Sequence, residues 1–123
     1  MNMMNKLAKH SKEMLMHLEW IEKRYIDGRK ENKKADFFGE VKPYADKVKQ
    51  ELDVWKEEAL HFLQSKATKK LWPMQINSAY DQIETCSIQA FYPETSKSRF
   101  TNQLQSAKYV VETLLRIVEE SEV

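Results

Sequence analysis

The sequence has little cysteine, glycine or proline: one, two and three residues respectively in a chain of 123. Cys86 has no second cysteine for an internal disulfide, which is typical of a reducing compartment and predicts a cytoplasmic protein. Few glycines and prolines leave little material for tight turns, and this argues against an all-β fold. No apolar run approaches the 18 or so residues of a transmembrane helix, so no membrane contact is expected. The N-terminal residues also lack the apolar run of a signal peptide.

Neither sign of charge dominates the chain. The 20 basic and 19 acidic residues give a formal net charge of +1. A general nucleic-acid binder needs a larger positive charge, so nucleic acid is not the expected partner of the whole surface. Apolar residues make up 41% and charged residues 32% of the chain, which fits a globular protein. A single domain of this length buries roughly two thirds of its unfolded surface, enough for a core.

Apolar residues recur every three or four positions in four separate stretches, which is the period of an α-helix with one buried face. The four sets are Met4, Leu7, Met14, Leu18, Ile21 and Tyr25; Val41, Tyr44, Val48, Leu52, Trp55, Ala59 and Phe62; Ile76, Ala79, Ile83, Cys86 and Ala90; and Phe100, Leu104, Ala107, Val111, Leu114 and Val118. Four such faces can bury one another, so the sequence predicts an all-α, single-domain four-helix bundle.

The helices are expected at about residues 2–26, 36–66, 73–91 and 96–120, and the short links between them imply an up-down-up-down arrangement. Gly28 is predicted to end the first helix as a left-handed C-cap. Asp36 is a predicted N-cap for the second. Gly39 and Pro43 leave two alternatives there: a separate turn before a helix that starts near Lys42, or one longer kinked helix.

Two segments resemble a known family: FFGEVKPYAD at residues 37–46 and QAFYPETSKSRF at residues 89–100. With the chain length, they are similar to the YppE-like family of small bacterial proteins from bacilli, and the resemblance spans the whole chain. It implies an all-helical bundle in the bacterial cytoplasm. The family has no assigned biochemical function, so the resemblance implies no catalytic residues.

No pattern of catalytic or metal-binding residues emerges. A carboxylate-bridged di-iron bundle needs two Glu-x-x-His pairs, and this chain has one, Glu58 and His61. His61 points about 150° away from the buried face and is expected in solvent. Cys86 lies in a buried set, where a thiol is unreactive. Gly28 and Gly39 are too far apart for a phosphate-binding loop. The sequence therefore predicts a non-enzyme without catalytic residues, metal or cofactor.

Met16 and Trp20 form an apolar pair that the helical period places on an outer face of the first helix. They are four residues apart, so they touch, and both point about 150° or more from the buried face. Tryptophan is enriched in binding hot spots, so this pair is a predicted site for a protein partner or for self-association. In the alternative, the next loop or an irregular bundle covers the pair. We expect a non-catalytic protein-protein interaction module.

A second candidate surface lies at the end of the bundle that gathers the first and third links. Its cations are Arg24, Arg29, Lys30, Lys33, Lys34, Lys97 and Arg99, and its carboxylates are Asp27, Glu31, Asp36 and Glu94. This basic end could bind RNA or a phosphorylated ligand. The alternative is a solvated loop region whose interleaved acids weaken the field. Phe91, Tyr92 and Phe100 lie beside it and are predicted to plug the end of the core rather than to stack bases.

Overall fold

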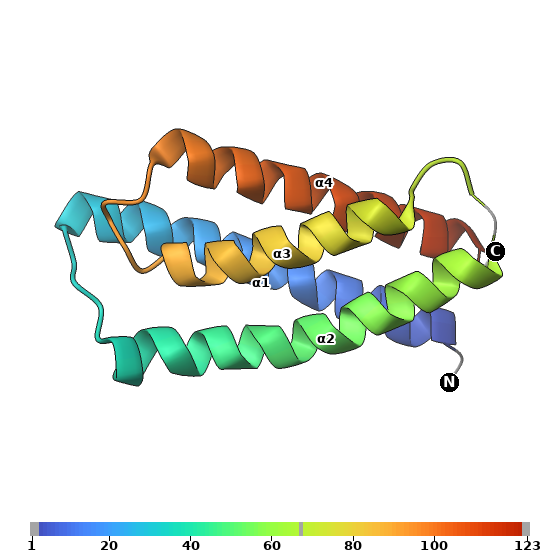
Figure 1. Cartoon of the computed structure of the whole chain (residues 1–123), viewed down its shortest axis with the longest axis horizontal. Helices are drawn as coiled ribbons and strands as arrows, with labels where there is room; N and C mark the ends of the chain where they lie inside the picture. The colour runs from blue at the N-terminus through green and yellow to red at the C-terminus, as the bar shows by residue number, and fades with distance from the viewer. Residues whose placement is uncertain (1–2, 67, 122–123) are drawn as a thin grey trace.

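Four long helices run in alternating directions, as the colour from blue to red shows in Figure 1. The computed structural model describes residues 3–66 and 68–121. The helices are α1 (Met3–Glu31), α2 (Lys42–Ser65), α3 (Pro73–Gln89) and α4 (Lys97–Ser121), with a π-helical turn, η1 (Phe37–Val41), directly before α2. The predicted all-α, up-down-up-down bundle in one domain is confirmed.

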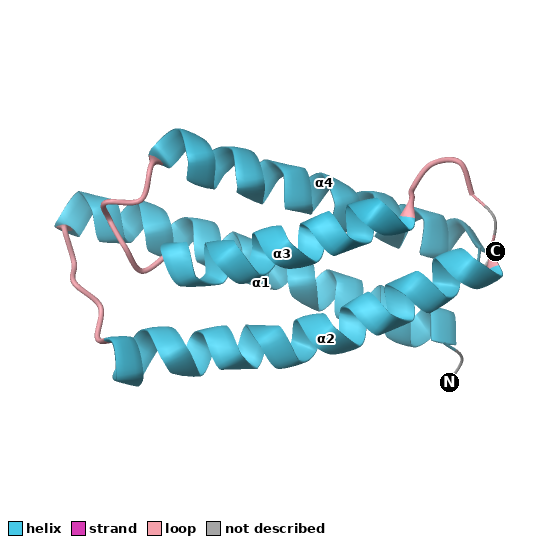
Figure 2. Cartoon of the chain, viewed as in Figure 1, coloured by secondary structure: helices cyan, strands magenta, loops and turns pink. Residues whose placement is uncertain are grey.

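Each helix packs against its two neighbours, in the order α1, α2, α3, α4 and back to α1, and every link is a short loop (Figure 2). Each buries the face that its apolar period predicts. The predicted residues of α3 and α4 are all buried, and so are those of the second set except Tyr44, which is half-buried. Of the first set, Leu7, Met14, Leu18, Ile21 and Tyr25 are buried; the side chain of Met4 lies outside the described ones. The predicted start at residue 2 also lies outside the described residues.

The end of α1 differs from the prediction. The helix continues past Ile26 and Gly28 to Glu31, and Asn32 takes the left-handed conformation instead, with φ of 48°. Asparagine tolerates that region better than most residues. Gly28 is a buried helical residue, and a Cβ atom there would lie 2.6 Å from Nη1 of Arg24. The absence of a side chain at Gly28 leaves space for Arg24, and the helix does not end there.

The start of α2 follows the first of the two predicted alternatives. A separate π-helical turn at residues 37–41 precedes a helix that begins at Lys42, and Pro43 lies in its first turn, where proline is tolerated. The prediction that Asp36 caps this segment with its side chain is wrong. Its carbonyl oxygen instead accepts the N–H groups of Glu40 at 2.8 Å and Val41 at 3.2 Å. These are the first main-chain bonds of the turn, and the carboxylate of Asp36 accepts no hydrogen bond from the N–H groups that a side-chain cap would serve.

The remaining ends lie close to their predicted positions. α3 begins at Pro73 as expected and ends two residues before Phe91, and α4 is displaced by one residue at each end. Oγ of Ser96 accepts the N–H of Arg99 at 3.4 Å, as an N-cap does. Phe91 and Phe100 are buried, which confirms that they plug the core. Within residues 3–66 and 68–121, no helix has the length and apolar character to cross a membrane.

One polar contact lies inside the interface of α1 and α2. Nε1 of Trp55 donates a hydrogen bond to Oγ of Ser11 at 3.0 Å, and both residues are fully buried. An indole N–H in an apolar core needs a hydrogen-bond acceptor, and Ser11 provides it. This hydrogen bond therefore favours one alignment of the two helices.

We predict that Ser11→Ala lowers the free energy of unfolding by about 1–3 kcal/mol, because it leaves the buried indole N–H of Trp55 without an acceptor. Urea unfolding followed by circular dichroism measures the loss. Ser106→Ala is the matched control, since Ser106 is exposed on α4 and its replacement should be neutral or slightly stabilising. Equal effects of the two substitutions would contradict the assigned role of Ser11.

Candidate functional site

A groove of about 520 Å³ lies between α1 and α2. Its lining is Glu13, Met16, His17 and Trp20 from α1, and Tyr44, Lys47 and Glu51 from α2. Met16 is 68% exposed and Trp20 43% exposed, so the two predicted contact residues both reach the surface. Trp20 is nevertheless partly covered, because its ring packs on Tyr44 with the centroids 4.3 Å apart. The structure thus places the predicted pair at the rim of a groove.

Trp20 belongs to an aromatic cluster that joins three helical segments. The ring of Phe91, just after α3, lies 5.9 Å from that of Trp20 and 6.0 Å from that of Tyr44, between centroids. The sequence indicated Tyr44 only as a core residue of α2 and Phe91 only as a plug. Their contact with Trp20 depends on how the helices align, which the apolar period does not specify. Trp20 is therefore held in a fixed orientation by rings from α2 and the third link.

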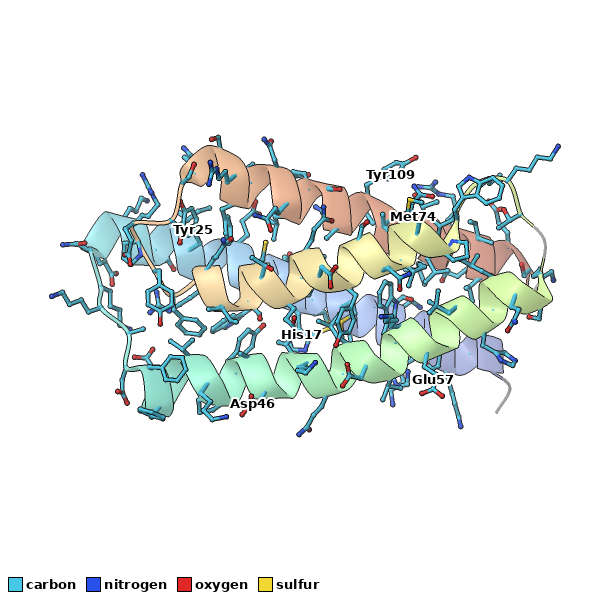
Figure 3. All side chains as sticks on the ribbon, viewed as in Figure 1. His17, Tyr25, Asp46, Glu57, Met74 and Tyr109 are labelled. Atoms are coloured by element: carbon cyan, nitrogen blue, oxygen red, sulfur yellow. The ribbon has the colours of Figure 1, made fainter. Side chains whose placement is uncertain are left out.

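His17 lies between α1 and α2 (Figure 3), with Nδ1 2.9 Å from the hydroxyl of Tyr44 and Nε2 3.1 Å from Oε2 of Glu51. In the neutral tautomer that fits these contacts, Nε2–H donates to the carboxylate and the phenol donates to Nδ1. Burial, and then the charge of Glu51, raise the pKa of Tyr44. The phenol therefore stays protonated, and this hydroxyl–imidazole–carboxylate chain lacks an activated nucleophile.

The other histidines do not complete a metal site. His10 contacts Glu58, with Nδ1 2.5 Å from Oε1, and this draws Glu58 away from the Glu-x-x-His pairing. His61 is exposed, as predicted. Among the residues that the structure describes, no three His, Cys, Asp or Glu side chains come close enough to hold a metal ion.

The surface around Met16 and Trp20 is mainly acidic. A second groove of about 510 Å³ on the outer side of α1 is lined by these two residues, by the exposed Ile26, and by Glu19, Glu22, Lys23 and Asp27. Nζ of Lys23 lies 2.7 Å from Oδ2 of Asp27, so this pair largely neutralises itself. Glu19 and Glu22 are left beside the apolar residues, and on the other side Glu13 and Glu51 outnumber one cation, Lys47.

The predicted basic end is not a uniform surface, because two of its seven cations make contacts within the protein: Arg24, which is largely buried, and Arg29, which is exposed. Nη1 of Arg29 donates to the carbonyl oxygens of Pro93 at 2.9 Å and Thr95 at 3.1 Å, beside the Tyr25 labelled in Figure 3. Arg24 packs over the Phe91 ring. The exposed cations are Arg29, Lys30, Lys33, Lys34, Lys97 and Arg99, with the exposed acids Glu31, Asp36 and Glu94 among them.

The comparisons with known proteins identify the family. Residues 11–118 match the family described as a bacterial domain of unknown function, DUF1798. The chain belongs to this family. The resemblance to YppE-like proteins is also confirmed, since the fold is similar to that of YppE from Bacillus subtilis at 22% identity, with 96% of each chain covered and a TM-score of 0.92.

Two other members of this structural group are similar. A protein of unknown function from Listeria innocua is 23% identical over 98% of this chain and 96% of that one, with a TM-score of 0.93. A DUF1798 protein from Staphylococcus aureus is 17% identical over 93% and 96%, with a TM-score of 0.85. No functionally curated protein matches the chain. At these identities the similarity establishes the fold, and nothing in the family indicates catalysis.

We predict that Cys86 does not react with a disulfide reagent in the folded protein. It is fully buried, and burial raises the pKa of its thiol to about 12, so the reactive thiolate is scarce at pH 8. Absorbance of the released thiolate should show modification at least about 100-fold slower than in the urea-unfolded chain. Similar rates in the two states would show that Cys86 is accessible.

Proposed function

We propose that this protein is a non-catalytic protein-protein interaction module that binds its partner through Met16, Trp20 and Ile26 on α1. The observation that carries the proposal is a tryptophan 43% exposed between two grooves. Tryptophans in such positions commonly dominate the binding energy of an interface. The hydrogen-bonded chain of Tyr44, His17 and Glu51 lacks an activated nucleophile, so the proposal includes no reaction at this surface.

The packing of Trp20 supports a role in binding. Its ring contacts Tyr44 and Phe91, which restrict its rotamers before any partner arrives. A side chain that is already fixed loses less conformational entropy on association than a free one. The exposed part of the ring can therefore act as a preformed anchor.

Charge indicates the kind of partner. Glu13, Glu19, Glu22 and Glu51 surround the apolar residues. A segment with apolar side chains flanked by lysines or arginines is complementary to this rim. A symmetric dimer through the same surface would bring two acidic rims together and repel. The proposal therefore favours a different protein, with a basic amphipathic segment, over a second copy of this chain.

Binding of RNA or a phosphorylated ligand at the basic end is the alternative function. Its support is the set of six exposed cations, of which Arg29 already bonds loop carbonyl oxygens. It is weaker than expected from the sequence, because Arg24 and Arg29 are committed to contacts within the fold. Such binding would fall steeply with salt concentration, and a flat salt response would count against it.

We expect Trp20→Glu to abolish partner binding and to preserve the fold, because a carboxylate replaces the anchor inside an acidic rim. Co-purification from the source bacterium, using the natural chain as bait, measures this. The matched control is Trp72→Glu, which makes the same change at an indole 58% exposed at the opposite end of the bundle.

A partner retained by the natural chain and by Trp72→Glu, but lost from Trp20→Glu, is the expected result. A synthetic peptide from that partner should bind more weakly to the double variant Glu19→Lys, Glu22→Lys. Equal retention by both tryptophan variants would overturn the assigned surface, and a partner peptide without basic residues would overturn the assigned charge.

A further inference from the structure

A pocket of about 350 Å³ lies where η1 and the start of α2 meet α1, and it adjoins the first groove through the shared residues Trp20, Tyr44 and Lys47. Three aromatic rings line it, those of Trp20, Tyr44 and Phe91, together with the charged side chains of Arg24, Glu40 and Lys47. Aromatic walls with a few converging charges are typical of small-ligand sites, and the volume lies at the lower end of their usual range. This pocket shares Trp20 with the partner surface but faces the η1 end of the bundle.

Arg24 is the unusual residue of this pocket. Its side chain is 11% exposed, and its guanidinium carbon lies 5.0 Å from the centre of the Phe91 ring. Its Nη2 atom is buried and has no hydrogen-bond acceptor. A guanidinium has five N–H donors, and leaving them unpaired in a buried place costs free energy. The fold therefore holds a cation whose hydrogen bonding is incomplete.

Gly28 gives Arg24 the room to lie there. A Cβ atom at position 28 would be 2.6 Å from Nη1 of Arg24, so any other residue would push the guanidinium aside. Glycine inside a helix costs about 1 kcal/mol relative to alanine. Gly28 thus lowers the stability of α1 one turn after Arg24, beside the guanidinium.

The carboxylate of Glu40 lies beside Arg24, where an external anion would also bind. Its Oε2 lies 3.8 Å from Nη2 of Arg24, which makes an ion pair but not a hydrogen bond. Glu40 is on the π-helical turn, a local structure found frequently at functional sites. Its side chain is 40% exposed, so it can leave the pocket without unpacking the core.

We propose that this pocket binds a small carboxylic acid with an aromatic group, whose carboxylate replaces Glu40 against Arg24 and approaches Lys47. The planar guanidinium matches a carboxylate through two parallel hydrogen bonds. The aromatic group stacks against Trp20 and Tyr44. A carboxylate is favoured over a phosphate dianion, because the carboxylate of Glu40 already forms the ion pair with Arg24.

The test uses the purified natural chain and indole-3-acetate as the probe, with its neutral amide as the matched control. NMR titration should show shifts at the Trp20 indole, and the acid should bind at least about tenfold tighter than the amide, because the amide cannot form the charged pair. Arg24→Met should remove this preference. Glu40→Gln should tighten binding of the acid several-fold, since it removes the internal competitor.

Gly28→Ala provides a variant that keeps the charge of Arg24. It should weaken acid binding by about tenfold while leaving the free energy of unfolding equal or higher, because alanine favours the helix. Arg99→Met changes an exposed cation outside the pocket and should leave binding unchanged.

Equal binding of the acid and the amide, or weaker acid binding by Glu40→Gln, would overturn the proposal, as would no shift at Trp20 at millimolar probe. A parallel titration with N-acetylphenylalanine distinguishes two sources of the same carboxylate. Tighter binding of that compound supports the C-terminus of a peptide as the ligand, and tighter binding of indole-3-acetate supports a free acid.

Discussion

The alignment of α1 against α2 fixes the geometry of the whole candidate surface. Four polar contacts hold it: the buried bond of Trp55 to Ser11, the pairs of His10 with Glu58 and His17 with Glu51, and the bond of the Tyr44 hydroxyl to His17. The two histidines are seven residues apart, as are the two glutamates, so the contacts repeat after about two turns of each helix. Sliding one helix along the other would separate both pairs and leave the buried indole N–H unsatisfied. The same alignment brings Tyr44 beside Trp20 and Glu40 beside Arg24.

The helical faces could be predicted because they depend on local periodicity and burial alone. Every member of the third and fourth apolar sets is buried, and the same rotation correctly placed His61 in solvent. It also indicated that Met16 and Trp20 point outward, which their exposed fractions agree with. A helix in a bundle must turn its apolar stripe inward whatever its neighbours are, so a single sequence contains this information.

The contacts between helices could not be predicted in the same way. Trp20 meets Tyr44 and Phe91 because of the alignment of α1 and α2 and the path of the third link, neither of which the apolar period encodes. Gly28 looked like a helix end because glycine usually serves there, whereas its function is to make room for Arg24, a tertiary effect. Charge counting likewise placed Arg24 and Arg29 on a basic surface, although the ring of Phe91 packs against Arg24 and loop carbonyl oxygens accept hydrogen bonds from Arg29.

The two ends of the bundle differ in the contacts of their charged side chains. At the end that holds the second link, Lys70 pairs with Glu120 and Lys12 with Glu119 in exposed ion pairs of the ordinary surface kind. At the η1 end, the fold keeps a glycine inside a helix, a π-helical turn and a buried guanidinium atom without an acceptor. Each of these features costs stability and none of them improves the core. Natural proteins depart from local rules mainly at functional sites, and this is why the proposed ligand pocket is assigned to the η1 end, around Arg24 and Trp20.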